Sequence, residues 1–417
     1  MTSCSADFCA PRAVQSTDGD SPIRVVHLIE ALGPGGAERL LYTNLKHLDP
    51  KRFRSTVLTL FSHATHWAEP IRRLGVPVES LNCRGLRDLL TGTLRLRVWL
   101  RRERPDLLHT HLWAASVVGR TAGQLTGIPV ISSIHNPEHE PEAWDDGSAV
   151  SLRKRRVIRA LDRWTAHFGC ERIVAVSEYV RQSTHRQLRF PLERTELLYN
   201  PIDVEEFQSS PASGRSELLR ELGLPAESII LLNVARVSPQ KGLLYAIRAL
   251  PLIRQRYPTA HLLSVGATTD PQWLARLKDE VVSLGLTQHV HILGTRRDIP
   301  DLLRSCDLFI FPSLYEGLGI ALIEAMAAGC ACIATETGPL TEVVRHGVNG
   351  WLIPPRDAEK IAEAVTALLA DPERREALGL AASRTALARF QPQAAADKLA
   401  QIYESVLSSA KSELAAV

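Results

Sequence analysis

The strongest constraint on the fold is an alternation of short apolar runs with amphipathic stretches, which occurs twice along the 417 residues. Strands that alternate with helices form parallel sheets with right-handed crossover connections. In the first series the predicted strands are 23–29, 55–60, 106–110, 129–134 and 172–176, and the predicted helices are 36–47, 66–74, 93–103, 113–126 and 151–167. In the second series the predicted strands are 229–235, 260–265, 289–293, 307–311, 330–334 and 350–353, and the predicted helices are 240–256, 271–284, 298–305, 319–328, 339–345 and 357–370.

This pattern predicts an α/β protein built from two Rossmann-like, doubly wound parallel-sheet domains that face a central cleft. We assign residues 22–205 to an N-terminal domain, 228–390 to a C-terminal domain, and the Pro-, Ser- and Gly-containing stretch 206–227 to a linker. The last stretch, 391–417, is predicted to be a helix, and its packing back on the N-terminal domain is left open. A ligand is expected between the domains, at the carboxyl ends of the strands.

Composition narrows the class of protein. Residues 1–21 are polar and predict a disordered tail without the apolar region of a secretory signal. Seven scattered cysteines form no CxxC pair, which favours a reducing cytoplasm over a disulfide framework or a zinc site. A net charge of +3 gives no reason to expect a nucleic-acid partner.

The segment around Arg236 and Lys241 has the features of a phosphate site. An apolar strand ends at Arg236, a Ser-Pro turn follows, and a helix is expected to begin near Gln240. Arginine offers a planar fork, lysine a point charge, and a helix start offers free N–H groups, which together suit a diphosphate. The alternative is that both side chains are solvated surface cations.

The segment from Phe311 to Ala327 is the second candidate. An apolar strand runs into a loop that contains Glu316, Gly317, Leu318 and Gly319, and Glu324 falls in the helix that follows. The glycines permit close approach of a ligand to the backbone. Burying the Glu324 carboxylate in an apolar helix is costly unless donors such as ribose hydroxyls satisfy it. The alternative is an exposed Glu316 and a Glu324 that pairs locally.

Together with the rest of the sequence from Ile23 to about Pro392, these two segments resemble the retaining glycosyltransferases of family 4, which have the GT-B fold. The most specific match is the E-x7-E spacing of Glu316 and Glu324. Supporting matches are Gly35-Gly36-Ala37-Glu38, Val174-Ala-Val-Ser177-Glu178, Asn200-Pro-Ile-Asp203, Arg236 with Lys241, Gly338-Pro-Leu-Thr-Glu342 and Gly347-Val-Asn-Gly350.

The resemblance implies a role for each matching residue. Arg236 and Lys241 would bind the donor diphosphate, Glu316 the donor sugar and Glu324 the ribose, while backbone groups near Gly294 and Thr295 would meet the base. It also implies a nucleotide diphosphate sugar, most commonly a UDP-sugar, as co-substrate, and neither a metal nor another cofactor. The sequence shows no DxD pair or His cluster that combines ligand spacing with a suitable context, and the adjacent Asp145 and Asp146 are not a convincing metal site.

The N-terminal half contributes weaker candidates. Gly35 and Gly36 precede a helix and suit an anion, although their spacing does not fit G-x-G-x-x-G, which argues against an NAD-dependent oxidoreductase. His135 ends a predicted strand and aligns with a family histidine that contacts the donor sugar; the alternative is a histidine bonded to a nearby loop. His109 and His111 suggest a metal, but alternating histidines on a strand are more often structural or face the acceptor.

Two basic, helical stretches, 94–104 and 152–164, interleave arginines with apolar residues and tryptophan. They either meet anionic lipid headgroups or form solvated helix faces with the tryptophans in the core. We therefore expect a cytoplasmic glycosyltransferase, with peripheral membrane contact open, that acts on a glycan or a lipid-linked acceptor. The alternatives are a nucleotide-sugar epimerase of the same fold and a non-catalytic nucleotide-sugar-binding protein.

Overall fold

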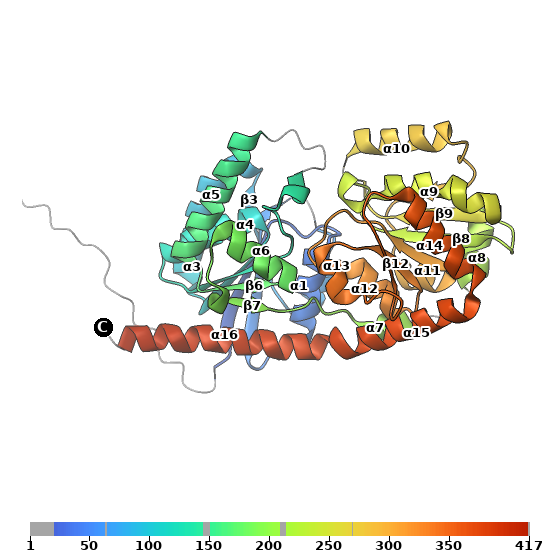
Figure 1. Cartoon of the computed structure of the whole chain (residues 1–417). Coiled ribbons are helices and arrows are strands. Elements are labelled where there is room, and N and C mark those ends of the chain that lie inside the picture. The colour runs from blue at the N-terminus through green and yellow to red at the C-terminus, as the bar shows by residue number, and fades with distance from the viewer. Residues whose placement is uncertain (1–20, 63–64, 145–150, 209–213, 269, 416–417) are drawn as a thin grey trace, which may run out of the picture.

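The computed structural model describes residues 21–62, 65–144, 151–208, 214–268 and 270–415. The tail predicted at 1–21 lies almost wholly outside this part of the chain, and so do Asp145 and Asp146. Two parallel sheets, each in its own domain, stand side by side (Figure 1). The prediction of two doubly wound parallel-sheet domains is therefore confirmed.

The first sheet has seven strands in the order β3-β2-β1-β4-β5-β6-β7. Its strands are β1 Ile23–Ile29, β2 Phe53–Phe61, β3 Val78–Cys83, β4 Leu107–His111, β5 Val130–Ile134, β6 Arg172–Ala175 and β7 Thr195–Leu197. Its helices are α1 Gly36–His47, α2 Ala68–Arg73, α3 Leu89–Glu103, α4 Trp113–Gln124, α5 Leu152–Gly169 and α6 Glu178–Leu188. The central strand β1 is buried from Val25 to Ile29, and four of these five residues are apolar, as expected for a strand that is covered on both faces.

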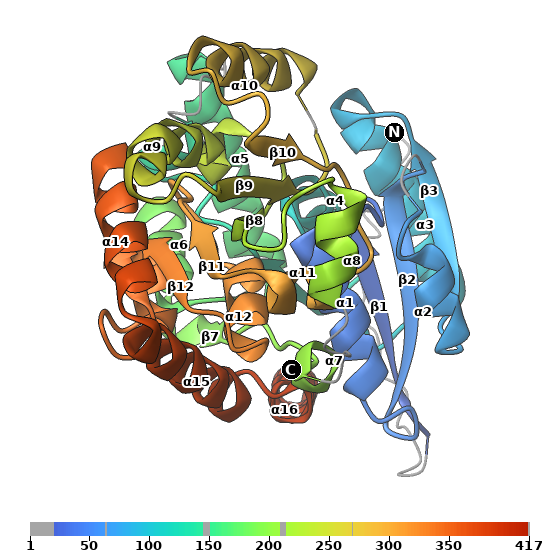
Figure 2. The ribbon, with the colours of Figure 1, turned by 90° about the vertical axis from the view of Figure 1, so that its right-hand side faces the viewer.

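The second sheet has six strands in the order β10-β9-β8-β11-β12-β13. Its strands are β8 Ile229–Val234, β9 Ala260–Val265, β10 Val290–Ile292, β11 Leu308–Phe311, β12 Cys332–Thr335 and β13 Trp351–Ile353. Its helices are α8 Gly214–Glu221, α9 Leu243–Arg256, α10 Pro271–Ser283, α11 Ile299–Ser305, α12 Ile320–Ala327, α13 Gly338–Val343, α14 Ala358–Ala370 and α15 Pro372–Arg389. Figure 2 shows these helices around the second sheet, viewed from its outer side.

The sequence pattern missed several elements. Strands β3 and β7 lie at the two edges of the first sheet and carry polar residues, so they lack the apolar runs of buried strands. The predicted linker also needs correction, because α7 Val204–Gln208 and α8 lie within or overlap 206–227. Leu218 and Leu219 of α8 are buried in the core of the second domain, so this part of the segment belongs to that domain.

The last helix, α16 Pro392–Ala415, follows α15 and crosses to the first domain, along the edge of both domains in Figure 1. Its apolar face packs on the first sheet: Leu399, Tyr403 and Val406 share a buried cluster with Val25 and Leu107. This contact covers one face of the first sheet with the end of the chain. Among the described residues, no helix is long and apolar enough to span a bilayer.

Candidate active site

The turn after β8 carries two cations toward the space between the domains. Strand β8 ends at Val234, a short 3-10 turn spans Pro239–Lys241, and α9 begins only at Leu243, slightly later than predicted. Gly242 precedes α9 with φ +65°, and a Cβ there would overlap the carbonyl oxygen of Pro312. Only glycine fits this position, and it holds the turn against the loop that follows β11.

Lys241 and Glu316 meet at the centre of the site. The Lys241 Nζ donates to Glu316 Oε1 over 2.6 Å, and both side chains are largely buried. Gln240 donates to the Tyr315 carbonyl (3.0 Å), and the Leu314 N–H donates to the Gln240 carbonyl (2.8 Å). The β8–α9 turn and the Glu316 loop thus form one polar wall of the second domain.

Glu324 lies in the second turn of α12 and is 5% exposed. It does not pair within its own helix. Its Oε1 forms an ion pair with Arg39 Nη1 (2.9 Å), and Arg39 belongs to α1 of the other domain. Burial raises the pKa of Glu324, Arg39 lowers it, and Glu206 raises it further. The local pairing considered from sequence is therefore wrong, since the partner comes from across the domain boundary.

The Gly35–Gly36 turn of the first domain faces this wall. A Cβ on Gly36 would lie 3.0 Å from Cδ1 of Ile320 in α12, so the two domains approach closely here. Glu38 folds over Gly35, and burial raises its pKa to about 7, against the opposing influence of Arg236. A carboxyl with this pKa is poised to change its protonation near neutral pH.

His135 follows β5 and is buried against the same wall. A Cβ on Gly317 would overlap the His135 carbonyl oxygen, which explains the glycine in the Glu316–Gly319 loop. Burial lowers the pKa of His135 to about 4, so its ring is neutral at physiological pH. Its Nδ1 has no hydrogen-bond partner among the described residues.

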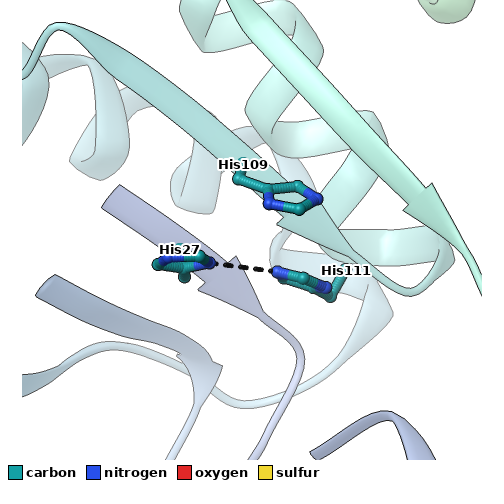
Figure 3. A group of neighbouring side chains, drawn as sticks. All are labelled: His27, His109 and His111. Carbon is teal, nitrogen blue, oxygen red and sulfur yellow. Dashed lines mark hydrogen bonds between the residues drawn. The ribbon is translucent and has the colours of Figure 1, made fainter. Parts of the chain in front are cut away.

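Three buried histidines from β1 and β4, His27, His109 and His111, lie close together (Figure 3). His27 Nδ1 is 3.3 Å from His111 Nε2, and His111 Nδ1 is 3.4 Å from His135 Nε2. The third ring of Figure 3, His109, uses both ring nitrogens, on Tyr403 of α16 (2.7 Å) and on Ser133 (2.8 Å). Burial lowers the pKa values of His27, His109, His111 and His135, so all four rings are neutral.

The ring nitrogens of His27, His109 and His111 lie within 4.8 Å of one another, a spacing that could hold a metal ion. However, both nitrogens of His109 are already hydrogen-bonded, and an ion here would need one of those bonds to break. The hydrogen bonds therefore favour the structural interpretation of His109 and His111 over the metal.

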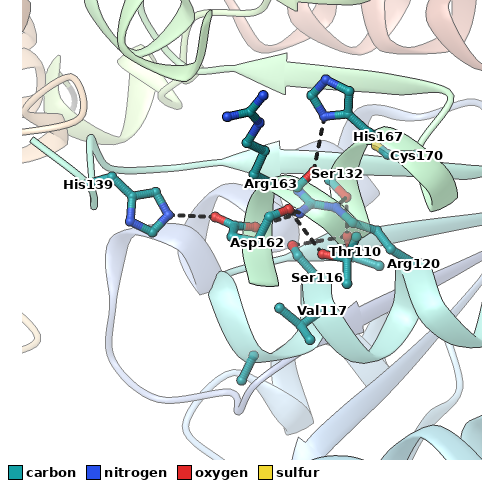
Figure 4. A network of polar contacts seen from close by, with 12 residues as sticks. Thr110, Ser116, Val117, Arg120, Ser132, His139, Asp162, Arg163, His167 and Cys170 are labelled. Atoms are coloured by element: carbon teal, nitrogen blue, oxygen red, sulfur yellow. Dashed lines mark hydrogen bonds and ion pairs between the residues drawn. The ribbon is translucent and has the colours of Figure 1, made fainter. Parts of the chain in front are cut away.

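A polar network fills the space beside these histidines (Figure 4). Arg120 donates to Asp162 Oδ1 (2.6 Å), and His139 Nε2 lies 2.7 Å from Asp162 Oδ2. His135, Glu138, His139 and Asp162 line a cavity of about 30 Å³, large enough for one or two water molecules. Burial, with nearby Asp162 and Glu30, raises the pKa of Glu138 to about 8.

The sequence-predicted residues fall into two groups. Arg236, Lys241, Glu316, Gly317, Leu318, Gly319 and Glu324 line the second domain opposite Gly35, Gly36 and His135 of the first. Gly294 and Thr295 follow β10, which β9 and β8 separate from β11, and the Gly266 N–H after β9 donates to the Gly294 carbonyl (2.8 Å). No contact recorded in the described chain joins Thr295 to the other candidates.

Sequence reasoning missed two residues at the domain boundary. In the sequence, Arg39 is an ordinary helix cation next to Glu38, and the residues around it do not indicate that Glu324 is its partner. The Glu342 carboxylate accepts from the Glu178 N–H (2.9 Å) and the Tyr179 N–H (2.7 Å), which binds α13 to the start of α6. Glu342 is the last residue of the motif Gly338–Glu342, and Arg39 directly follows the motif Gly35–Glu38; these positions are the signal that could have found them.

Two family profiles match the chain: "Glycosyltransferase Family 4" over residues 34–206 and "Glycosyl transferases group 1" over residues 214–385. The D-inositol 3-phosphate glycosyltransferase of Thermobispora bispora is 30% identical over 77% of this chain and 75% of its own. The UDP-Gal:alpha-D-GlcNAc-diphosphoundecaprenol alpha-1,3-galactosyltransferase of Escherichia coli is 26% identical over 73% of this chain and 76% of its own. The structure of HepE from Anabaena in complex with UDP-glucose is similar with a TM-score of 0.80 and 25% identity, over 92% of this chain and 100% of that one.

Proposed function

Since this chain is a glycosyltransferase that belongs to group 1 and family 4 and has the GT-B fold, we propose that it transfers a sugar from a UDP-sugar, with retention of the anomeric configuration, to a hydroxyl of a glycan or lipid-linked acceptor. The observation that carries the proposal is the wall formed by Arg236, Lys241 and Glu316 opposite Gly36 and His135. UDP is proposed because the E. coli relative is named for a UDP-sugar and HepE was solved with one.

In the proposed reaction, Arg236 and Lys241 stabilise the charge that develops on the departing diphosphate. In the free protein Lys241 forms an ion pair with Glu316. A bound diphosphate would replace Glu316 as the partner of Lys241, and Glu316 would then accept hydrogen bonds from the sugar hydroxyls. Buried, neutral His135 is a hydrogen-bonding group rather than a cation at this wall. The donor site as proposed uses neither a metal nor another cofactor.

The donor can be identified by measuring nucleoside diphosphate release from UDP-, GDP- and ADP-sugars, with and without candidate lipid-linked and free glycan acceptors. We expect release from a UDP-sugar that depends on acceptor, and a product anomer that NMR coupling constants show to match that of the donor. Isomerised sugar formed without acceptor would instead indicate the epimerase. Tight binding with no product from any acceptor would indicate the non-catalytic protein.

Variants test the site itself. Lys241→Ala and Arg236→Ala should each lower kcat by about 100-fold, the scale of removing one transition-state donor. Lys360→Ala is a suitable control, because Lys360 is an exposed lysine of α14 that pairs with Glu363 of the same helix. Wild-type kcat and donor KM in either site variant would contradict the phosphate assignment.

The basic stretches support a proposal about where the enzyme works. Leu86, in the short 3-10 turn before α3, and Leu90, Leu94 and Val98 of α3 recur every four residues as one exposed apolar stripe, with Leu90 82% exposed. On α5, Leu152, Val157, Trp164 and Phe168 are also exposed, among the exposed cations Arg153, Lys154, Arg156 and Arg159. Both helices lie on the side of the first domain away from the second (Figure 1).

We propose that α3 and α5 rest on an anionic membrane, which would bring the enzyme to a lipid-linked acceptor. Trp99 agrees with the interpretation of the tryptophans as core residues, since it packs inward and donates to Glu79 (3.0 Å), whereas Trp164 is exposed.

Flotation with vesicles that contain phosphatidylglycerol should recover the wild type and fail to recover Leu90→Asp. Val282→Asp, at a site 66% exposed on α10, is the matched control and should float like the wild type. Equal flotation of all three proteins would refute this proposal, as would dimerisation through the same stripe.

A further inference from the structure

The Glu324 carboxylate is held on one side only. Arg39 Nη1 is 2.9 Å from Oε1, and no hydrogen bond to Oε2 is found within the described residues. Glu324 lies in a helix whose neighbours Ile323, Ala325 and Met326 are all buried and apolar. A buried carboxylate with one paired oxygen still requires a donor for the other.

Arg39 is itself held in place by α7 (Val204–Gln208), the start of the segment that joins the two domains, which we call the joining segment. Its Nη2 donates to Glu206 Oε2 (3.0 Å), and its guanidinium lies over the Phe207 ring, 5.4 Å from the centroid. One nitrogen of the fork thus faces α7 and the other faces α12. Because a planar guanidinium held at both ends has little freedom left, the arginine is fixed before any ligand arrives.

Arg39 also affects the protonation of Glu324. Burial raises the pKa of Glu324, and Glu206 acts in the same direction, whereas Arg39 lowers it. Removing Arg39 would leave a buried carboxyl with two influences that favour the neutral acid. A neutral acid accepts hydrogen bonds less strongly than a carboxylate, because charge-assisted bonds are the strong ones.

We infer that Arg39 is a positioning residue for the nucleotide sugar: it holds Glu324 as a carboxylate by one oxygen and leaves the other to accept from the vicinal ribose hydroxyls. This inference rests on the proposed function, which places the ribose at Glu324. Because Arg39 and Glu324 come from different domains, ribose recognition is complete only when the domains are closed on each other.

Lys46 offers a matched control. It lies two turns after Arg39 on α1 and pairs with Asp203, next to the same joining segment, over 2.5 Å. Replacing Lys46 by methionine therefore removes an ion pair between α1 and the joining segment without touching Glu324. A general loosening of the domain boundary would affect Arg39→Met and Lys46→Met alike.

The test is the ratio of Kd values for 2′,3′-dideoxy-UDP and UDP, measured by calorimetry on the full chain, with the GDP and ADP pairs run in parallel. The wild type should prefer the ribose form by about 10-fold or more, the scale of hydrogen bonds to a charged group. Arg39→Met should reduce the ratio to near one, Arg39→Lys should retain part of it, and Lys46→Met should keep the wild-type ratio.

The outcomes separate this inference from the proposed function. Absence of binding of UDP, GDP and ADP to the wild type would mean that the proposed function has failed. An unchanged ratio in folded Arg39→Met, with both nucleotides bound more weakly, would mean that Arg39 only holds the domains together, and the inference would be wrong. A wild-type ratio near one would also overturn it. If Arg39→Met does not fold, the ratio for Arg39→Lys decides, since it must fall between one and the wild-type value.

Discussion

Acid should destabilise the first domain because its buried histidines are held neutral. The variant His27→Phe measures how much His27 alone contributes to this loss in the free energy of unfolding. His27 is fully buried in β1, and burial lowers its pKa from 6.5 to about 3. The unfolded chain therefore takes up a proton on this residue as the pH falls below 6.5, whereas the folded chain does not do so until about pH 3. Stability from the neutral ring is fully present above pH 6.5 and is lost as the pH falls toward 3.

The size of the effect follows from that window. Each pH unit between the two pKa values is worth about 1.4 kcal/mol, so lowering the pH from 7.5 to 5.0 crosses about 1.5 effective units and costs about 2 kcal/mol through His27 alone. His109, His111 and His135 act in the same direction. They are present in both proteins, so the part of their contributions that comes from burial cancels when the wild type and the variant are compared; the smaller influence of His27 on the pKa values of His109 and His111 does not.

The assay is urea denaturation at pH 7.5 and pH 5.0, followed by tryptophan fluorescence, for the wild type, His27→Phe and Val26→Ala. The free energy of unfolding of the wild type should fall by about 2 kcal/mol more than that of His27→Phe between the two pH values. Val26 is a buried neighbour in β1 that cannot titrate, so Val26→Ala should be less stable at both pH values with the wild-type difference between them. Equal losses in wild type and His27→Phe would show that the ring is not held neutral, and the linkage argument would fail.

Two further predictions concern stability. Asp162→Asn leaves Arg120 buried without its charge partner, so the melting temperature should drop with a loss of about 3–5 kcal/mol, and a loss below about 1 kcal/mol would contradict the buried ion pair. Gly242→Ala and Gly285→Ala share a positive φ, but only at Gly242 would the new Cβ meet backbone, the Pro312 carbonyl. Urea midpoints should show a loss of about 1 kcal/mol for Gly285→Ala and a clearly larger one for Gly242→Ala; equal losses would mean that the turn can shift.

Much of the fold was predictable because it depends on local periodicity. Buried parallel strands need apolar residues on both faces, so β8 and β11 stand out as short apolar runs. The same reasoning failed at the edge strand β7, which is three residues long and partly polar, and in the predicted linker, where α8 packs through only two leucines. Short or polar elements acquire their structure from what they pack against, and their own pattern carries little of it.

For the site, sequence by itself determined which residue types stand at the strand ends: the cations after β8, and the carboxylates Glu316 and Glu324 around the start of α12. The tertiary structure alone decided their partners. Lys241 meets Glu316, Arg39 reaches Glu324 from the other domain, and Tyr403 of α16 reaches His109 beneath the first sheet. The reason is physical: periodicity reports which face of an element is buried, whereas an ion pair between distant segments exists only once two domains have packed and set the positions of both side chains.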